Sequence, residues 1–145
     1  MTRTWEPKPP QFLDYVGAIY DLRASDAEWC EAIQRITTAQ LPGELCGMVG
    51  VGSIADDTIT PKAGWATEPA ILEYSTRVCL RLPKNYVRQR INNPAATDRQ
   101  IVGPAVDELS ERSATHEMGA RDTFIVAGVD PDGFTVSRGA LVPDF

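Results

Sequence analysis

The feature that most constrains the fold is an Asp-Pro-Asp-Gly segment, residues 130–133, between two apolar runs near the C-terminal end of the chain. These residue types are typical of a tight turn, because proline fixes its own φ angle and glycine accepts a positive one. The flanking runs, residues 123–129 and 134–141, are rich in residues that favour strands. The sequence therefore predicts a β-hairpin, whose two strands must be antiparallel.

A second hairpin is predicted earlier in the chain. Residues 45–54, with the sequence LCGMVGVGSI, are typical of a buried strand, Asp56–Asp57 of a turn, and residues 58–66 of the returning strand. Gly47, Gly50 and Gly52 do not form a phosphate-binding loop, because no lysine, serine or threonine follows at the required spacing. We interpret them as glycines that allow close backbone packing in a strand.

Helical spacing of apolar residues occupies most of the remaining chain. Ser25 and Glu28 are spaced as a capping box for the second helix, and Pro69 suits the first turn of the third. Residues 84–100 are ambiguous, with a short helix around Tyr86 and a loop forced by Asn92-Asn93-Pro94. The predicted helices cover residues 11–23, 25–41, 68–82 and 101–118, the last ending at Gly119.

This order of elements predicts one α+β domain, with a central antiparallel sheet flanked by helices. Residues 1–10 hold three prolines and little apolar pattern, so they are expected to form an N-terminal arm before a domain spanning residues 11–145. The chain has 145 residues, which is enough for one sizeable core.

Charge and hydropathy indicate which partners and which cell compartment to expect for such a domain. The net charge of −6 disfavours contact with nucleic-acid phosphates. The densest basic stretch is interpreted as the solvated face of a helix; it comprises Arg77, Arg81, Lys84, Arg88 and Arg90. No apolar run approaches the roughly 20 residues that cross a bilayer, and the first residues do not resemble a secretory signal. We expect a cytoplasmic protein without membrane contact.

The sequence offers no recognisable catalytic constellation. A triad would have to use His116, the single histidine, and three dispersed cysteines without a CxxC pair disfavour a metal site. Cys30, Cys46 and Cys79 are interpreted as small apolar residues of the core. The paired aspartates lie in predicted turns. We therefore expect neither an enzyme nor a cofactor or metal site.

Two segments carry a resemblance. Ile19-Tyr20-Asp21, followed by Asp26 and Trp29, resembles the opening of GAF/PAS-like sensor domains in bacterial transcriptional regulators of the LuxR type. The closing segment, with Gly119, Arg121 and Asp122 before the last hairpin, is similar to the end of the same domains. The resemblance implies a signal-sensing domain that controls an attached helix-turn-helix module, which reads DNA and lies outside this chain.

The resemblance also implies a site for a small-molecule ligand between the sheet and the helices that follow the first hairpin. The candidate lining residues are Trp65, Tyr74, Cys79 and Tyr86, with Arg121 and Asp122 where the chain re-enters the sheet. Completion of an ordinary core and an ion pair is the alternative for each of them.

A homodimer is the expected assembly. The first helix is apolar almost all round, so either the core or a partner chain must cover its second side. The candidate interface residues are Phe12, Leu13, Val16, Ile19 and Tyr20. Two other functions stay open, namely a stand-alone small-molecule-binding protein and a cysteine-dependent methionine sulfoxide reductase of GAF type, in which Cys46 and Cys79 meet across a cleft.

Overall fold

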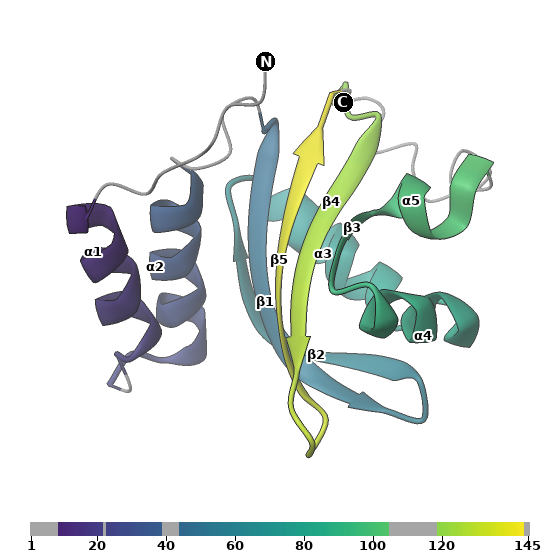
Figure 1. Ribbon diagram of the computed structural model, residues 1–145, viewed down its shortest axis with the longest axis horizontal. Coiled ribbons are helices and arrows are strands. Elements are labelled where there is room, and N and C mark those ends of the chain that lie inside the picture. The colour runs from purple at the N-terminus through teal and green to yellow at the C-terminus, as the bar shows by residue number, and fades with distance from the viewer. Residues whose placement is uncertain (1–8, 22, 39–43, 105–118, 144–145) are drawn as a thin grey trace.

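The computed structural model describes residues 9–21, 23–38, 44–104 and 119–143. These residues form a five-stranded antiparallel sheet with helices on both faces, which confirms the predicted α+β class (Figure 1). In chain order the elements are α1 (Pro9–Ile19), α2 (Asp26–Thr38), β1 (Cys46–Ala55), β2 (Thr58–Ala66), α3 (Pro69–Cys79), α4 (Lys84–Asn92), β3 (Ala95–Thr97), α5 (Asp98–Val102), β4 (Asp122–Val129) and β5 (Phe134–Val142).

The strands are ordered β2-β1-β5-β4-β3 across the sheet. Both predicted hairpins are confirmed, and β1 pairs with β5, so the two hairpins are joined at the centre of the sheet. The edge strand β3 was not predicted from the sequence. It has only three residues and directly follows the Asn-Asn-Pro loop signal, so its pairing with β4 depends on contacts distant in the chain.

Both hairpin turns use the backbone conformations that their residues favour. Asp56 and Asp57 adopt φ angles of 51° and 58°. In the second turn, Oδ1 of Asp130 accepts hydrogen bonds from the backbone N–H groups of Asp132 and Phe134. Gly133 has a φ of 84°, and a Cβ placed there would lie 2.4 Å from the carbonyl oxygen of Ile54. Only glycine satisfies both conditions without strain.

Helix α2 covers one face of the sheet over β1 and β2, and α1 packs on the outer side of α2 (Figure 1). The predicted capping box is confirmed: Glu28 N–H donates to Ser25 Oγ, and Ser25 N–H donates to the Glu28 carboxylate. The pKa of Glu28 is lowered because its carboxylate accepts hydrogen bonds from the backbone N–H and from the hydroxyl of Ser25. Helix α2 buries Cys30 and Ile33 against Val49 and Val51 of β1. Helix α1 begins at Pro9, so the last two residues of the expected arm are helical.

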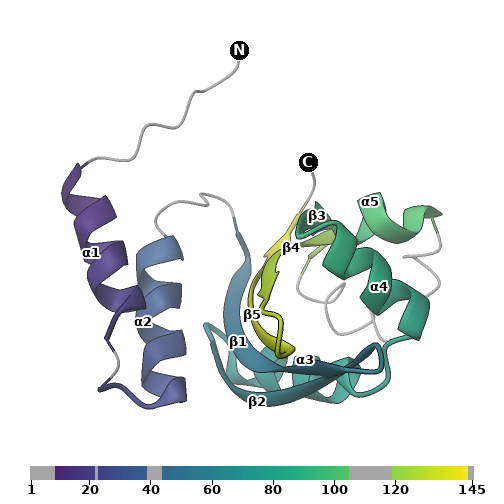
Figure 2. The same cartoon turned by 60° about the horizontal axis from the view of Figure 1, so that its bottom comes forward.

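Helices α3, α4 and α5 lie on the opposite face, and Figure 2 shows the sheet bending around α3 and α4. The prediction of one helix over residues 101–118 is wrong at its start. Helix α5 begins at Asp98, and its C-cap is Gly103 at a φ of 61°. Residues 105–118, including His116, lie outside the described part of the chain. None of the described helices has the length and apolar character needed to cross a membrane.

Candidate ligand cavity

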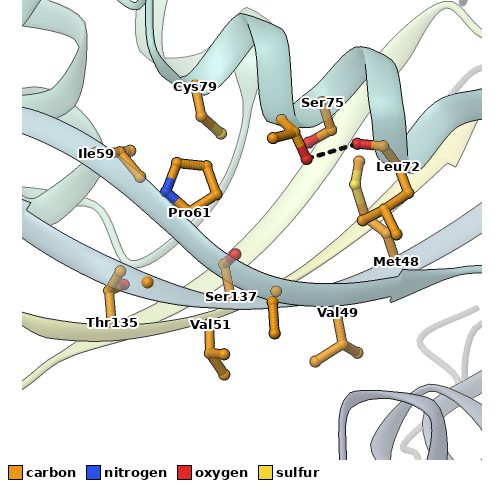
Figure 3. A pocket seen from close by; sticks show the side chains of 14 residues that line it. Met48, Val49, Val51, Ile59, Pro61, Leu72, Ser75, Cys79, Thr135 and Ser137 are labelled. Carbon is orange, nitrogen blue, oxygen red and sulfur yellow. Dashed lines mark hydrogen bonds between the residues drawn. The ribbon is translucent and has the colours of Figure 1, made fainter. Parts of the chain in front are cut away.

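A cavity of about 330 Å³ lies between the sheet and helices α3 and α4. A smaller recess of about 70 Å³ adjoins it beneath α3, and the two share several wall residues (Figure 3). Apolar side chains from β1, β2, β4, α4 and the segment between α3 and α4 form most of the wall: Met48, Ile54, Ile59, Leu82, Val87 and Ile125. The size and apolar lining are those of a small-molecule site.

The cavity exists because small residues alternate with large ones along the central strands. Val49 and Val51 of β1 point into the cluster beneath α2, so Gly50 and Gly52 between them face α3. On β5, Ser137 and Gly139 face the same way, opposite Gly50 and Met48 of β1. A larger side chain at Gly50 would extend toward Ser137 and fill the recess, whereas one at Gly52 would meet the backbone of Thr60 and Pro61 in β2. Sequence analysis missed Ser137, although the alternation Val-Gly-Val-Gly is a period-two signal for an underfilled face.

Four hydroxyl groups and one thiol line the recess, and one of the hydroxyls, that of Thr76 on α3, donates to the Leu72 carbonyl. Ser75 and Cys79 lie on α3, whereas Thr135 and Ser137 lie on β5. Figure 3 shows the Cys79 sulfur directed toward the sheet and the Ser137 hydroxyl directed toward α3. Thr135 Oγ1 donates to the carbonyl oxygen of Gly128 at 3.0 Å. The Ser75 hydroxyl lies near the Cys79 thiol and partly offsets the rise in the pKa of Cys79 that burial causes.

A buried ionic cluster closes the α4 side of the cavity. The guanidinium of Arg90 donates to Asp98 Oδ1 at 2.5 Å, to the Tyr86 hydroxyl at 3.1 Å and to the Ala96 carbonyl at 2.7 Å. The Tyr86 hydroxyl also donates to Asp98 Oδ1. Burial, reinforced by the charge of Asp98, raises the pKa of Tyr86, so its hydroxyl stays protonated.

The interpretation of the basic stretch as a solvated helix face is wrong for Arg90, which is only 5% exposed. Its partner Asp98 follows a loop and a strand, so helical spacing alone could not reveal the pair. Arg88 does face solvent, but its Nε lies 2.6 Å from Oδ2 of Asp57 in the first hairpin turn. These two ion pairs attach α4 at one side to the β1–β2 turn and at the other to α5, which holds it over the cavity.

Of the six candidate ligand residues, the structure brings Cys79 and Tyr86 to the cavity. Trp65 lies on the other face of the sheet, where it packs against the cluster beneath α2. It pairs with Val49 across the strands, and paired residues share a face, so its position follows from the register. Tyr74 lies on α3 and is half-buried, but it does not line the cavity.

Arg121 and Asp122 stand at the start of β4, away from this wall. Asp122 is buried, and its Oδ1 accepts hydrogen bonds from the backbone N–H groups of Arg99 and Thr123. It therefore fastens the first turn of α5 to β4. For Asp122 this position favours the alternative of a structural role in the core over contact with a ligand.

The candidate interface residues divide between the two sides of α1. Leu13 and Tyr20 are 69% and 73% exposed, whereas Ile19 packs against the cluster beneath α2. Val16 is half-buried, and the side chain of Phe12 lies outside what the structure describes. The outer side of α1 thus presents apolar side chains to solvent.

The three cysteines lie in separate surroundings. Cys30 belongs to the cluster beneath α2, Cys46 packs with Ile71 near the start of α3, and Cys79 ends that helix at the cavity. Cys79 lies eight positions after Ile71 on the same helix, a rise of about 12 Å. Burial raises the pKa of all three thiols, that of Cys30 to about 11. Neither the spacing nor the pKa favours a thiolate nucleophile.

No protein-family model matches this sequence, and comparison with curated proteins finds no similar chain.

Proposed function

We propose that this domain binds a small molecule in the cavity between the sheet and helices α3 and α4, and serves as the signal-sensing and dimerising part of a transcriptional regulator. The observation that carries the proposal is the cavity of about 330 Å³ itself, because a well-packed domain rarely leaves an apolar space of this size. The resemblance of the two end segments to GAF/PAS-like domains of LuxR-type regulators supports the regulatory context.

Ligand binding acts by shifting a population of conformations. The wall formed by α3 and α4 rests on the sheet through side chains at the cavity, and two ion pairs join α4 to the β1–β2 turn and to α5. A ligand that fills the cavity favours the arrangement of these helices that fits it best. The attached DNA-reading modules of a dimer then change their relative position.

The cavity part of the proposal is tested by thermal unfolding of the domain with neutral molecules of the cavity's size. We expect some of them to raise the melting temperature of the wild type but not that of Ala127→Phe. Ala127 lines the cavity from β4, so a phenyl ring there occupies the ligand's space. Shifts of equal size in both proteins would contradict binding in the cavity.

The dimer part is tested by light scattering at tens of micromolar protein. Leu13 is 69% exposed in one protomer, so Leu13→Asp disturbs folding little and should convert a dimer to a monomer. A monomer mass for the wild type would count against the interface. Reading the gene past the codon for Phe145 decides whether a helix-turn-helix module follows or whether the domain acts alone.

A further inference from the structure

We propose that the cavity selects a neutral, mainly apolar molecule with one hydrogen-bonding group, and that the Ser137 hydroxyl is the partner of that group. This inference rests on the proposed function, since it describes the ligand of the same cavity. It follows from the cavity's size, from its charge balance and from the hydrogen bonds that its hydroxyl groups already make.

The volume limits the ligand to a small bicyclic or branched molecule. The cavity of about 330 Å³ is about twice the roughly 150 Å³ that accommodates benzene in an apolar protein interior. A ligand of about 10 to 14 non-hydrogen atoms therefore fits. Nucleotides and larger cofactors exceed this size.

The charge balance disfavours an ion. Arg90 is the one charged residue among the described residues that line the cavity, and its guanidinium is already paired with Asp98. Its Nε has no partner within the described structure, but this atom is covered by protein and is not presented to the cavity. An anionic ligand would be buried without a counter-ion, and a cationic one would lie beside a guanidinium.

The hydrogen-bonding capacity of the wall is concentrated at Ser137. The hydroxyl groups of Thr135 and Thr76 donate to backbone carbonyls, the Ser75 hydroxyl lies near the Cys79 thiol, and the Tyr86 hydroxyl lies between Arg90 and Asp98. No hydrogen bond to the Ser137 hydroxyl is found within the described residues, and it stands in the recess opposite α3 (Figure 3). Its neighbour across the strands is Gly50, where even an added Cβ would lie 3.7 Å from Ser137 Oγ. A ligand oxygen or N–H group can therefore approach this hydroxyl.

Three probes that share one ring system test the inference: naphthalene, 2-naphthol and naphthalene-2-sulfonate. They are titrated into the purified domain, and binding is followed by calorimetry or by probe fluorescence. We expect 2-naphthol to bind at least about tenfold more tightly than the sulfonate, because the anion finds no counter-charge. Ser137→Ala should lower the affinity for 2-naphthol by roughly threefold to tenfold and leave the affinity for naphthalene unchanged.

Ser75→Ala is the matched control, since it removes a hydroxyl group of the same wall that lies on α3, beside the Cys79 thiol and across from Ser137. It should leave the affinity for 2-naphthol within about twofold of the wild type. Ala127→Phe should prevent binding of all three probes. If that variant does not fold, alkylation of Cys79 in the folded wild type fills the same space.

The outcomes separate the inference from the proposed function. Equal binding of 2-naphthol and the sulfonate, or equal effects of the two serine variants, would overturn the neutral ligand and its Ser137 anchor while the cavity remains a binding site. Failure of all three probes to bind the folded wild type would overturn both. Tighter binding of 2-naphthol that depends on Ser137 supports both.

Discussion

Replacing Asp98 by asparagine tests whether the buried ionic cluster fixes helix α4 over the cavity. The side chains of Arg90 and Asp98 are 6% and 16% exposed, and Asp98 is the counter-ion found for this guanidinium within the described structure. The asparagine side chain would keep the shape and one acceptor oxygen but would leave a buried cation without an opposite charge. Breaking such a pair from one side costs roughly 3–5 kcal/mol, and the retained acceptor places the expected loss near about 3 kcal/mol.

The loss of unfolding free energy is measured by urea unfolding. The comparison holds if the slope of this free energy against urea concentration is the same in the variant and the wild type. At roughly 2–4 °C per kcal/mol for a domain of this size, the melting temperature should fall by about 6–12 °C. Arg88→Gln is the matched control on the same helix, because the side chains of Arg88 and Asp57 are 63% and 26% exposed. An ion pair so exposed contributes at most about 1 kcal/mol.

A double variant, Arg90→Met with Asp98→Asn, removes the buried charge together with its partner. Its loss of stability should be smaller than the sum of the two single losses, because neither charge is then left unpaired. The reasoning is refuted if Asp98→Asn costs no more than Arg88→Gln, or if the two single losses simply add.

Three further predictions concern other parts of the fold. Burial, reinforced by Asp26, raises the pKa of Cys30 from its ordinary value of 9.0 to about 11, so the folded state holds this proton more tightly than the unfolded chain. That contribution is complete below the unfolded pKa and is lost as the pH rises through the folded one. Between about pH 8 and pH 11 the wild type should therefore lose on the order of 2 kcal/mol more stability than Cys30→Ala, and parallel pH profiles would contradict this. Gly133→Ala should destabilise more than Gly103→Ala in urea unfolding, because both have positive φ but only Gly133 also meets a carbonyl oxygen; equal losses would refute the steric argument. Mass spectrometry after brief treatment with iodoacetamide should find Cys79 alkylated before Cys30, which is fully buried, and saturating 2-naphthol should slow the reaction at Cys79.

The sequence predicted the elements whose signals are local. Both hairpins, the Ser25–Glu28 capping box and the helices around Ile71 and Tyr86 follow from residue types at fixed spacings, and the structure confirms them. Element ends were less accurate: α3 ends at Cys79, three residues before the predicted end. The sequence predicted helix α3 correctly, but the residue at which it ends depends on packing.

The cavity was predicted less well, because its wall depends on register. Trp65 was expected at the ligand site, yet its pairing with Val49 directs it to the opposite face. Ser137 and Arg90 were missed as site residues, since the strand order that places β5 beside β1 and the loop that returns Asp98 to α4 are long-range features. Cys79 and Tyr86 do line the cavity, as their positions on the helices after the first hairpin suggested, and their contact with a ligand stays a prediction.

At strand β1 the recess beneath α3 and the cluster beneath α2 lie on opposite faces of the sheet, separated by one layer of backbone. Gly50 and Gly52 border the recess that adjoins the cavity, and Val49 and Val51 belong to the cluster on which α2 and the end of α1 rest. A local change in the tilt or twist of this strand therefore alters both compartments at once, with no intervening layer to absorb it. Variants at Val49 or Val51 thus provide a way to ask how rigidly events at the ligand are coupled to the outer helices.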